Sequence, residues 1–235
     1  MARNSQVRFC CLSGLAGSLL FLAGDMTWYG SFSSAAAFHS FQVMAQRSDA
    51  LLVAGGAVGP IAALFSASGM AVFYFALQPA SQKLARAAAI LLAAMILIGG
   101  AYHALFAVFG FAQKIGDASL RHLLITQVAF LRDTVGYAMY ATGGSGIALV
   151  YWLALSRKTH FPRWLLFFTP ILSQAGWLFD SWFRRIPAPL GAIITGGWIN
   201  GTFVLFFALA TAAFWRLGRA PATMDLPAEH TARAV

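Results

Sequence analysis

Residues 164–185 read WLLFFTPILSQAGWLFDSWFRR. The stretch is long and apolar enough to cross a bilayer, which takes about 20 mostly apolar residues, so it predicts a transmembrane helix. Near its end stands Asp180, followed by Arg184 and Arg185. An acidic side chain at hydrocarbon depth costs up to about 3 kcal/mol and therefore usually faces a protein-lined cavity or a partner. Asp180 is thus a candidate functional residue; the alternative is that it caps the helix and pairs with Arg184.

The composition is typical of an integral membrane protein. Of the 235 residues, 60% are hydrophobic and only 10% are charged, and the mean hydropathy is +0.72. The net charge of +9 does not indicate nucleic-acid binding, because the basic residues lie in short gaps between apolar runs, where they set topology and contact lipid phosphates. The two cysteines, Cys10 and Cys11, are adjacent and cannot form a disulfide framework or a cysteine metal site. We expect membrane lipids as partners, and neither a metal nor another cofactor.

The apolar runs predict an all-α, polytopic bundle over residues 1–217. About six stretches are long enough to be transmembrane helices, at residues 9–30, 51–77, 87–112, 134–156, 164–183 and 190–215. Residues 31–49 and 117–132 are too polar to span, and we expect them as interfacial amphipathic helices. The polar residues 218–235 are expected to form a disordered cytoplasmic tail.

The amino terminus and the basic residues predict the topology. The first 24 residues have the basic start and apolar centre of a secretory signal, but the apolar run continues to Tyr29 and further spans follow, which indicates a retained first helix. With the amino terminus inside, ten lysines and arginines fall on the inner side and six on the outer side. Both termini are therefore predicted to be cytoplasmic.

Polar and aromatic side chains are concentrated toward the outer end of the predicted bundle. The candidate residues are Asp25, Tyr29, His39, His103, Asp133, Tyr137, Tyr140, Trp177, Asp180, Trp198 and Asn200. Asp25 interrupts an apolar run and has no cationic neighbour one turn away. The others have structural alternatives: Trp28 and Tyr29 suit an interfacial aromatic belt, His103 can bond a backbone carbonyl, and Asp133 can cap its helix.

Several chemistries are excluded by missing residues. No lysine lies within a span, which excludes a retinal Schiff base, and a single histidine well inside a span argues against bis-histidine haem. The metalloprotease, serine-hydrolase and P-loop motifs are also absent. What remains is aspartate and histidine among aromatic rings. A carboxyl group in apolar surroundings favours its neutral, proton-donating form, and aromatic faces can stabilise a cationic intermediate.

We therefore predict an integral membrane enzyme with acid/base chemistry of the isomerase or cyclase type. Its substrate would be a lipophilic small molecule resembling an isoprenoid or a sterol. Asp25, Asp180 and His103 are the predicted catalytic residues, and the other candidates would orient them or contact the substrate. The alternatives are a proton-coupled transporter, a lipophile-binding or sensing protein, and a subunit that only packs into a larger complex. A carrier needs polar residues through the inner half as well, and the inner halves here are nearly pure Ala, Leu, Phe and Ile.

Two resemblances accompany this interpretation. The layout is similar to that of small membrane-bound terpene cyclases, which also rely on acids near one end of a helical bundle, although no motif matches residue by residue. The stretches AGDMTWYG at residues 23–30, AGGAVGPIAALF at 54–65 and PAPLGAIITGGWINGTFVLFFALA at 187–210 resemble an uncharacterised family of bacterial multi-pass membrane proteins. That resemblance implies six spans and a bacterial inner membrane, and it supplies no activity.

Overall fold

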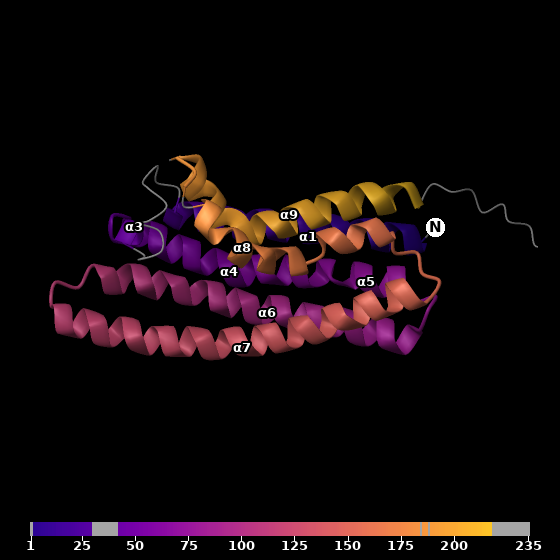
Figure 1. The fold of residues 1–235 in the computed structure, drawn as a ribbon, viewed down its shortest axis with the longest axis horizontal. Helices are drawn as coiled ribbons and strands as arrows, with labels where there is room; N and C mark the ends of the chain where they lie inside the picture. The colour runs from indigo at the N-terminus through magenta and orange to yellow at the C-terminus, as the bar shows by residue number, and fades with distance from the viewer. Residues whose placement is uncertain (1, 30–41, 184, 188, 218–235) are drawn as a thin grey trace, which may run out of the picture.

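The computed structural model describes residues 2–29, 42–183, 185–187 and 189–217; within these ranges it leaves the side chains of residues 2–4, 174–178, 180, 216 and 217 undescribed. Long helices run side by side along one axis (Figure 1). They are α1 (Ala2–Tyr29), α4 (Asp49–Gly69), α6 (Gln82–Gln113), α7 (Ala118–Ser156) and α9 (Leu190–Leu217). The short helices are α3 (Gln42–Ala45), α5 (Ala71–Leu77), the 3-10 helix η1 (Arg163–Phe168) and α8 (Ile171–Phe183). The described part contains no strand, which confirms the predicted all-α class.

Five helices are long and apolar enough to cross a membrane: α1, α4 continued through α5, α6, α7 and α9. The predicted count of about six is not confirmed, because residues 164–183 do not form one helix. Proline lacks an N–H and clashes with the preceding turn, so η1 ends before Pro170 and α8 begins after it. Thr169 is extended, with ψ at 169°, as a residue before proline prefers. The 13 residues of α8 cover about 20 Å, too little to cross the hydrocarbon layer alone.

The segment 117–132 is not the separate interfacial helix that its polarity predicts. Asp117 caps the start of α7 through a 2.9 Å bond from the Leu120 N–H, and α7 then continues for 39 residues without a break. This length is about 58 Å, and the α6–α7 hairpin extends beyond the other helices at one end of the bundle (Figure 1). The alternative role of Asp133 as an N-cap is therefore wrong. Of the segment 31–49, only residues from Gln42 onward are described, and residues 218–235 lie outside the described part.

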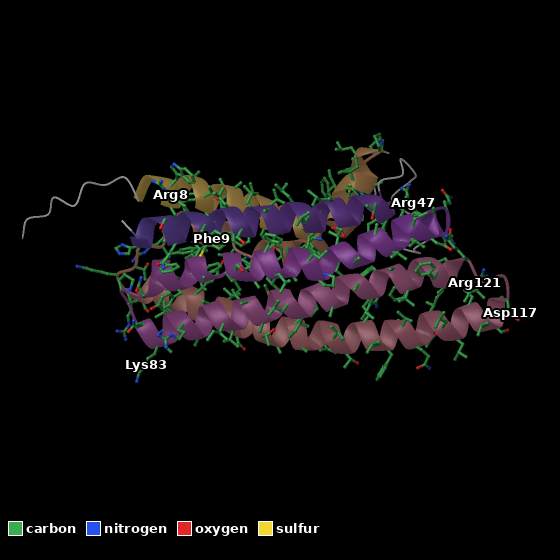
Figure 2. All side chains as sticks on the ribbon, turned by 180° about the vertical axis from the view of Figure 1, so that it is seen from behind. Arg8, Phe9, Arg47, Lys83, Asp117 and Arg121 are labelled. Atoms are coloured by element: carbon green, nitrogen blue, oxygen red, sulfur yellow. The ribbon has the colours of Figure 1, made fainter. Side chains whose placement is uncertain are left out.

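The two ends of the bundle can be told apart by the residues labelled in Figure 2. We name them the Lys83 end, where Arg8 also lies, and the Asp117 end, where α6 turns into α7 and Arg47 lies nearby.

Helix α1 packs against α4 and α9, whereas α6 packs against α4 and α7. Small residues bring α4 and α6 together: a Cβ on Gly100 would lie 2.6 Å from the Ala63 Cβ. This is the close backbone approach that small residues permit between membrane helices.

Aromatic rings fill the bundle toward the Lys83 end. The Phe73 ring stacks on Phe206, with centroids 5.3 Å apart and planes 4° from parallel, and on Phe161 at 5.6 Å. All three side chains are buried. Leu77 and Leu153 belong to the same buried cluster. The core is therefore closely packed at the Lys83 end.

Candidate ligand site

A cavity of about 990 Å³ lies among α1, α6, α7 and α9. Its volume is at the upper end of the range for small-molecule sites. Along α7 it is lined by Arg132, Tyr140, Gly143, Ile147 and Tyr151, which recur on one face at helical spacing. From the first to the last of these residues α7 rises about 28 Å. The cavity is therefore elongated along the bundle axis.

Asp25 lies at the centre of the polar part of the cavity. Its Oδ2 accepts a 2.6 Å hydrogen bond from the Asn200 Nδ2, and its Oδ1 lies 3.7 Å from the His103 Nδ1. Asp25 and His103 are buried, and all three residues line the cavity. Among the described residues no lysine or arginine forms an ion pair with Asp25. The sequence places these residues in three different predicted spans, and the fold of α1, α6 and α9 brings them together.

The His103 ring is held in place by rings and by glycines. Trp28 stacks on it with centroids 4.5 Å apart and planes 28° from parallel, and Phe21 meets it edge-on at 5.3 Å. A Cβ on Gly59 would lie 2.6 Å from the His103 Cδ2, and a Cβ on Gly24 would lie 2.8 Å from its Nε2. Only glycine fits at both positions. The imidazole is therefore fixed with Nδ1 toward Asp25.

Trp28 and Tyr29, for which the sequence suggests a place in an interfacial aromatic belt, are buried in the bundle. Tyr29 lines the cavity and is only 4% exposed, and Trp28 is 1% exposed and also lines it. The interfacial-belt interpretation is therefore wrong for both. Tyr140, predicted to contact substrate, also lines the cavity.

Three other predicted residues do not line the cavity. The Tyr137 side chain is 74% exposed. Asp133 is half-exposed and its Oδ1 pairs with Arg132, at 2.6 Å from Nη2 and 2.8 Å from Nε. Trp198 instead joins α8 to α9: its Nε1 donates to the Ser173 carbonyl at 3.1 Å. Their predicted contact with substrate has no support in their placement.

The remaining candidates cannot be placed as side chains. His39 lies outside the described residues, and Trp177 and Asp180 lie on α8 in a part of the helix where side chains are not described. The predicted catalytic role of Asp180 therefore stays a prediction.

Arg132 and Tyr102 are polar residues of the cavity that are not among the candidates that the sequence suggests. Arg132 lines the cavity with its guanidinium 5.3 Å from the Phe109 ring centroid, and Tyr102 lines it beside His103. The sequence does hold a signal for Arg132, which lies two turns before Tyr140 on the same helical face. Because the sequence predicts a separate helix at residues 117–132, it does not place Arg132 on the same continuous helix as Tyr140.

The cavity ends before the Lys83 end. Tyr151, which lines the cavity, donates a 2.8 Å hydrogen bond from its hydroxyl to the Leu166 carbonyl of η1. Beyond it lies the stacked cluster around Phe73. The arrangement is a pocket with an aromatic floor.

The fold and the cavity define a helical bundle of the membrane type with an elongated internal pocket. The chain belongs to a family of unknown function, DUF6796, whose model matches residues 1–214. Comparison with curated proteins and with solved structures gives no match. The family match agrees with the resemblance of the chain to an uncharacterised family, and it carries no activity.

Proposed function

We propose that this protein is an integral membrane enzyme that performs acid/base chemistry on a lipophilic substrate, with Asp25 as the group that exchanges the proton. The observation that carries the proposal is the buried Asp25 carboxyl, held between Asn200 and His103 and facing a cavity of about 990 Å³. Water-poor surroundings strengthen electrostatic interactions with a reacting group. A fixed carboxyl with an adjacent imidazole is a pair suited to general acid/base catalysis.

The geometry gives each of the three residues a role. The Asn200 amide occupies Oδ2 of Asp25 and fixes the plane of the carboxyl group. Oδ1 faces the His103 Nδ1 at 3.7 Å, and a small approach would bring the two atoms within the roughly 2.6–3.2 Å that proton transfer requires. His103 would then supply or store the proton, and Asp25 would be the catalytic residue that contacts substrate.

The aromatic wall favours the isomerase or cyclase type of reaction within this proposal. Trp28, Tyr29 and Tyr102 line the cavity close to Asp25, and aromatic faces stabilise a positive charge that develops on a hydrocarbon skeleton. An isoprenoid- or sterol-like substrate would fit such chemistry. The similarity in layout to terpene cyclases remains an analogy, and Asp180 on α8 remains the proposed second acid.

Two alternatives differ in what they require of the cavity. A proton-coupled transporter needs a path to the second side, and the floor formed by Tyr151 and the stacked phenylalanines opposes one. A lipophile-binding or sensing protein needs only the pocket. This second alternative is favoured by one observation: Asp25 is the only acidic residue among the described residues that line the cavity.

The charge distribution supports a proposed orientation in a bacterial inner membrane. Among the basic residues with described side chains, six lie at the Lys83 end and five toward the Asp117 end, a small excess at the Lys83 end. The six are Arg8, Lys83, Arg86, Arg157, Lys158 and Arg163, and the five are Arg47, Lys114, Arg121, Arg132 and Arg185. The acidic residues with described side chains all lie toward the Asp117 end, at Asp25, Asp49, Asp117 and Asp133. Because cytoplasmic segments are enriched in Lys and Arg, the Lys83 end and both termini would be cytoplasmic, with the polar half of the cavity toward the outer leaflet.

The enzyme proposal is tested by following lipids rather than one chosen substrate. Wild type and Asp25→Asn are placed in nanodiscs with a total bacterial lipid extract, and mass spectrometry follows every lipid over time. We expect wild type to convert one lipid class at least about 100-fold faster than the variant, since a positioned acid/base group contributes about 10²–10⁴. Asp49→Asn, which removes an exposed carboxylate that pairs with Lys114 outside the cavity, is the control and should retain the wild-type rate. Binding of a lipid without conversion by wild type would refute the enzyme and favour the binding alternative.

A further inference from the structure

Five residues that line the cavity are exposed, whereas the rest of the described lining is buried or half-buried. On α7 the exposed lining residues are Tyr140, Gly144 and Ala148; on α8 and α9 they are Ile171 and Ile199. Ile171 is 47% exposed and Ile199 is 49% exposed. Ile147 and Phe203 also line the cavity and are buried, so contact with the cavity does not by itself expose a side chain. These five residues therefore mark the rim of a side opening, which we call the α7–α9 opening.

The helix packing explains why the bundle is open there. Helix α7 packs along α6 and reaches α5 and η1, whereas α9 packs against α1, α8 and η1. In the part of the chain that the structure describes, α7 and α9 have no comparable contact with each other. Figure 1 shows them at opposite edges of the bundle. At Gly144 a Cβ would meet no described atom within 4 Å, so no described side chain fills the opening at this position.

The opening lies at the depth of the hydrocarbon layer. Gly144 is 12 residues from Arg132 and 12 from Ser156, the end of α7, which is about 18 Å along the axis in each direction. The hydrocarbon core is about 30 Å thick. The rim is apolar apart from the Tyr140 hydroxyl. A passage with these properties connects the cavity to lipid chains rather than to water.

We propose that the α7–α9 opening is a lateral portal through which a single-chain lipid enters the cavity from the bilayer. The inference rests on the proposed function, and it specifies the class of the ligand. A cavity of about 990 Å³ that follows α7 for about 28 Å is long enough to hold an extended chain parallel to the bundle axis.

The lining chemistry orients this lipid. Hydrogen-bond donors lie toward the Asp117 end, at Tyr29, Tyr102 and Arg132. The lining toward the Lys83 end is mainly apolar and includes Met95, Ile96, Ile147 and Phe203. A head group with acceptor oxygens would bind near Arg132, through the guanidinium N–H groups that do not donate to Asp133. The chain would then pass Asp25 and end near Ile147.

The portal is tested with a fatty acid that carries a photoactivatable diazirine near the end of its chain. The probe is added to nanodiscs of phosphatidylcholine that contain the full-length protein, and adducts are mapped by peptide mass spectrometry after illumination. In wild type we expect adducts on the cavity-facing residues between 144 and 151 and between 199 and 203, removed by excess oleate. Gly144→Trp should reduce these adducts at least about tenfold, and Gly144→Leu should reduce them less.

Gly201→Trp is the matched control, because a Cβ there also meets no atom within 4 Å and Gly201 does not line the cavity. This variant should label like wild type. Adducts confined to outward-facing side chains of wild type would overturn the portal, even if Gly144→Trp failed to fold. Full labelling of a folded Gly144→Trp would overturn it as well. The labelling requires no turnover, so a labelled cavity without conversion of any lipid would refute the enzyme and keep the portal.

Discussion

The side of the bundle where α1, α4 and α6 meet differs sharply from the side where α7 faces α9. On the first side, glycines sit in direct contact with side chains of the next helix, as Gly59 does with His103 and Gly110 with Leu52. On the second side, a Cβ added at Gly144 would meet no described atom within 4 Å. The same residue type therefore serves tight packing on one side and leaves space on the other.

The difference separates two requirements of a site inside a membrane protein. The packed side fixes the position of Asp25 and His103, because Trp28 and the glycines leave the imidazole no alternative orientation. The open side gives a ligand access to them. Catalysis needs groups held in a fixed geometry, whereas exchange of a lipid needs a gap. In this fold the packing of α1, α4 and α6 provides the fixed geometry, and the gap between α7 and α9 provides the access.

The largest expected effect concerns the packed side. Trp28→Ala removes a 1% exposed indole that stacks on His103 and Phe106 and donates from Nε1 to the Leu52 carbonyl at 3.3 Å. We expect the free energy of unfolding in mixed micelles to fall by about 3–5 kcal/mol, because truncating a buried aromatic residue leaves a cavity. Trp152→Ala is the control, since this indole is 62% exposed and should cost far less. Equal losses in the two variants would show that the packed side is not the rigid one.

A smaller effect compares the two kinds of glycine. Gly59→Leu forces a side chain against the His103 ring, where even a Cβ would lie 2.6 Å from Cδ2, and overpacking of this kind costs about 1–3 kcal/mol. Gly144→Leu adds the same atoms where nothing lies within 4 Å, so its melting temperature should match that of wild type. Melting curves of the two variants and of wild type, recorded in the same detergent, give the loss of stability at each glycine. A large destabilisation by Gly144→Leu would mean that the open side is packed in solution.

Much of the fold could be predicted from the sequence, because long apolar runs in a chain of this composition form helices wherever they lie. The break at Pro170 is visible only as a proline, which can kink a helix within one span or end it. The continuous α7 is not predicted, because a helix that extends beyond the bilayer carries polar residues such as Asp117 and Arg121 without any interruption in backbone geometry. Polarity marks where water begins and does not mark where a helix ends.

The sequence predicts how deep the candidate residues lie in the membrane. It does not predict toward which neighbouring helix each side chain points. The positions of Asp25, His103 and Asn200 along three predicted spans give them a similar depth, and the three side chains do meet. The spacing of Asp133, Tyr137 and Tyr140 indicates one face, but only Tyr140 lines the cavity. The cavity-facing side of α7 is set by its packing on α6, which the sequence of α7 alone does not encode. The rotation of each helix about its axis is decided by its neighbours.

The smallest expected effect tests whether the polar group on the packed side depends on α9. Asn200→Leu removes the amide that donates to Asp25 Oδ2 at 2.6 Å, and it leaves a buried carboxyl short of a partner, at a cost of about 1–2 kcal/mol. Thr202→Val, two residues on, removes only a hydroxyl that bonds the Ile199 carbonyl of its own helix and should cost less. If Asn200→Leu destabilised no more than Thr202→Val in the same mixed micelles, α9 would not hold the Asp25 carboxyl. The fixed geometry would then come from α1 and α6 alone, and α9 would be free to move away from α7 when a lipid enters.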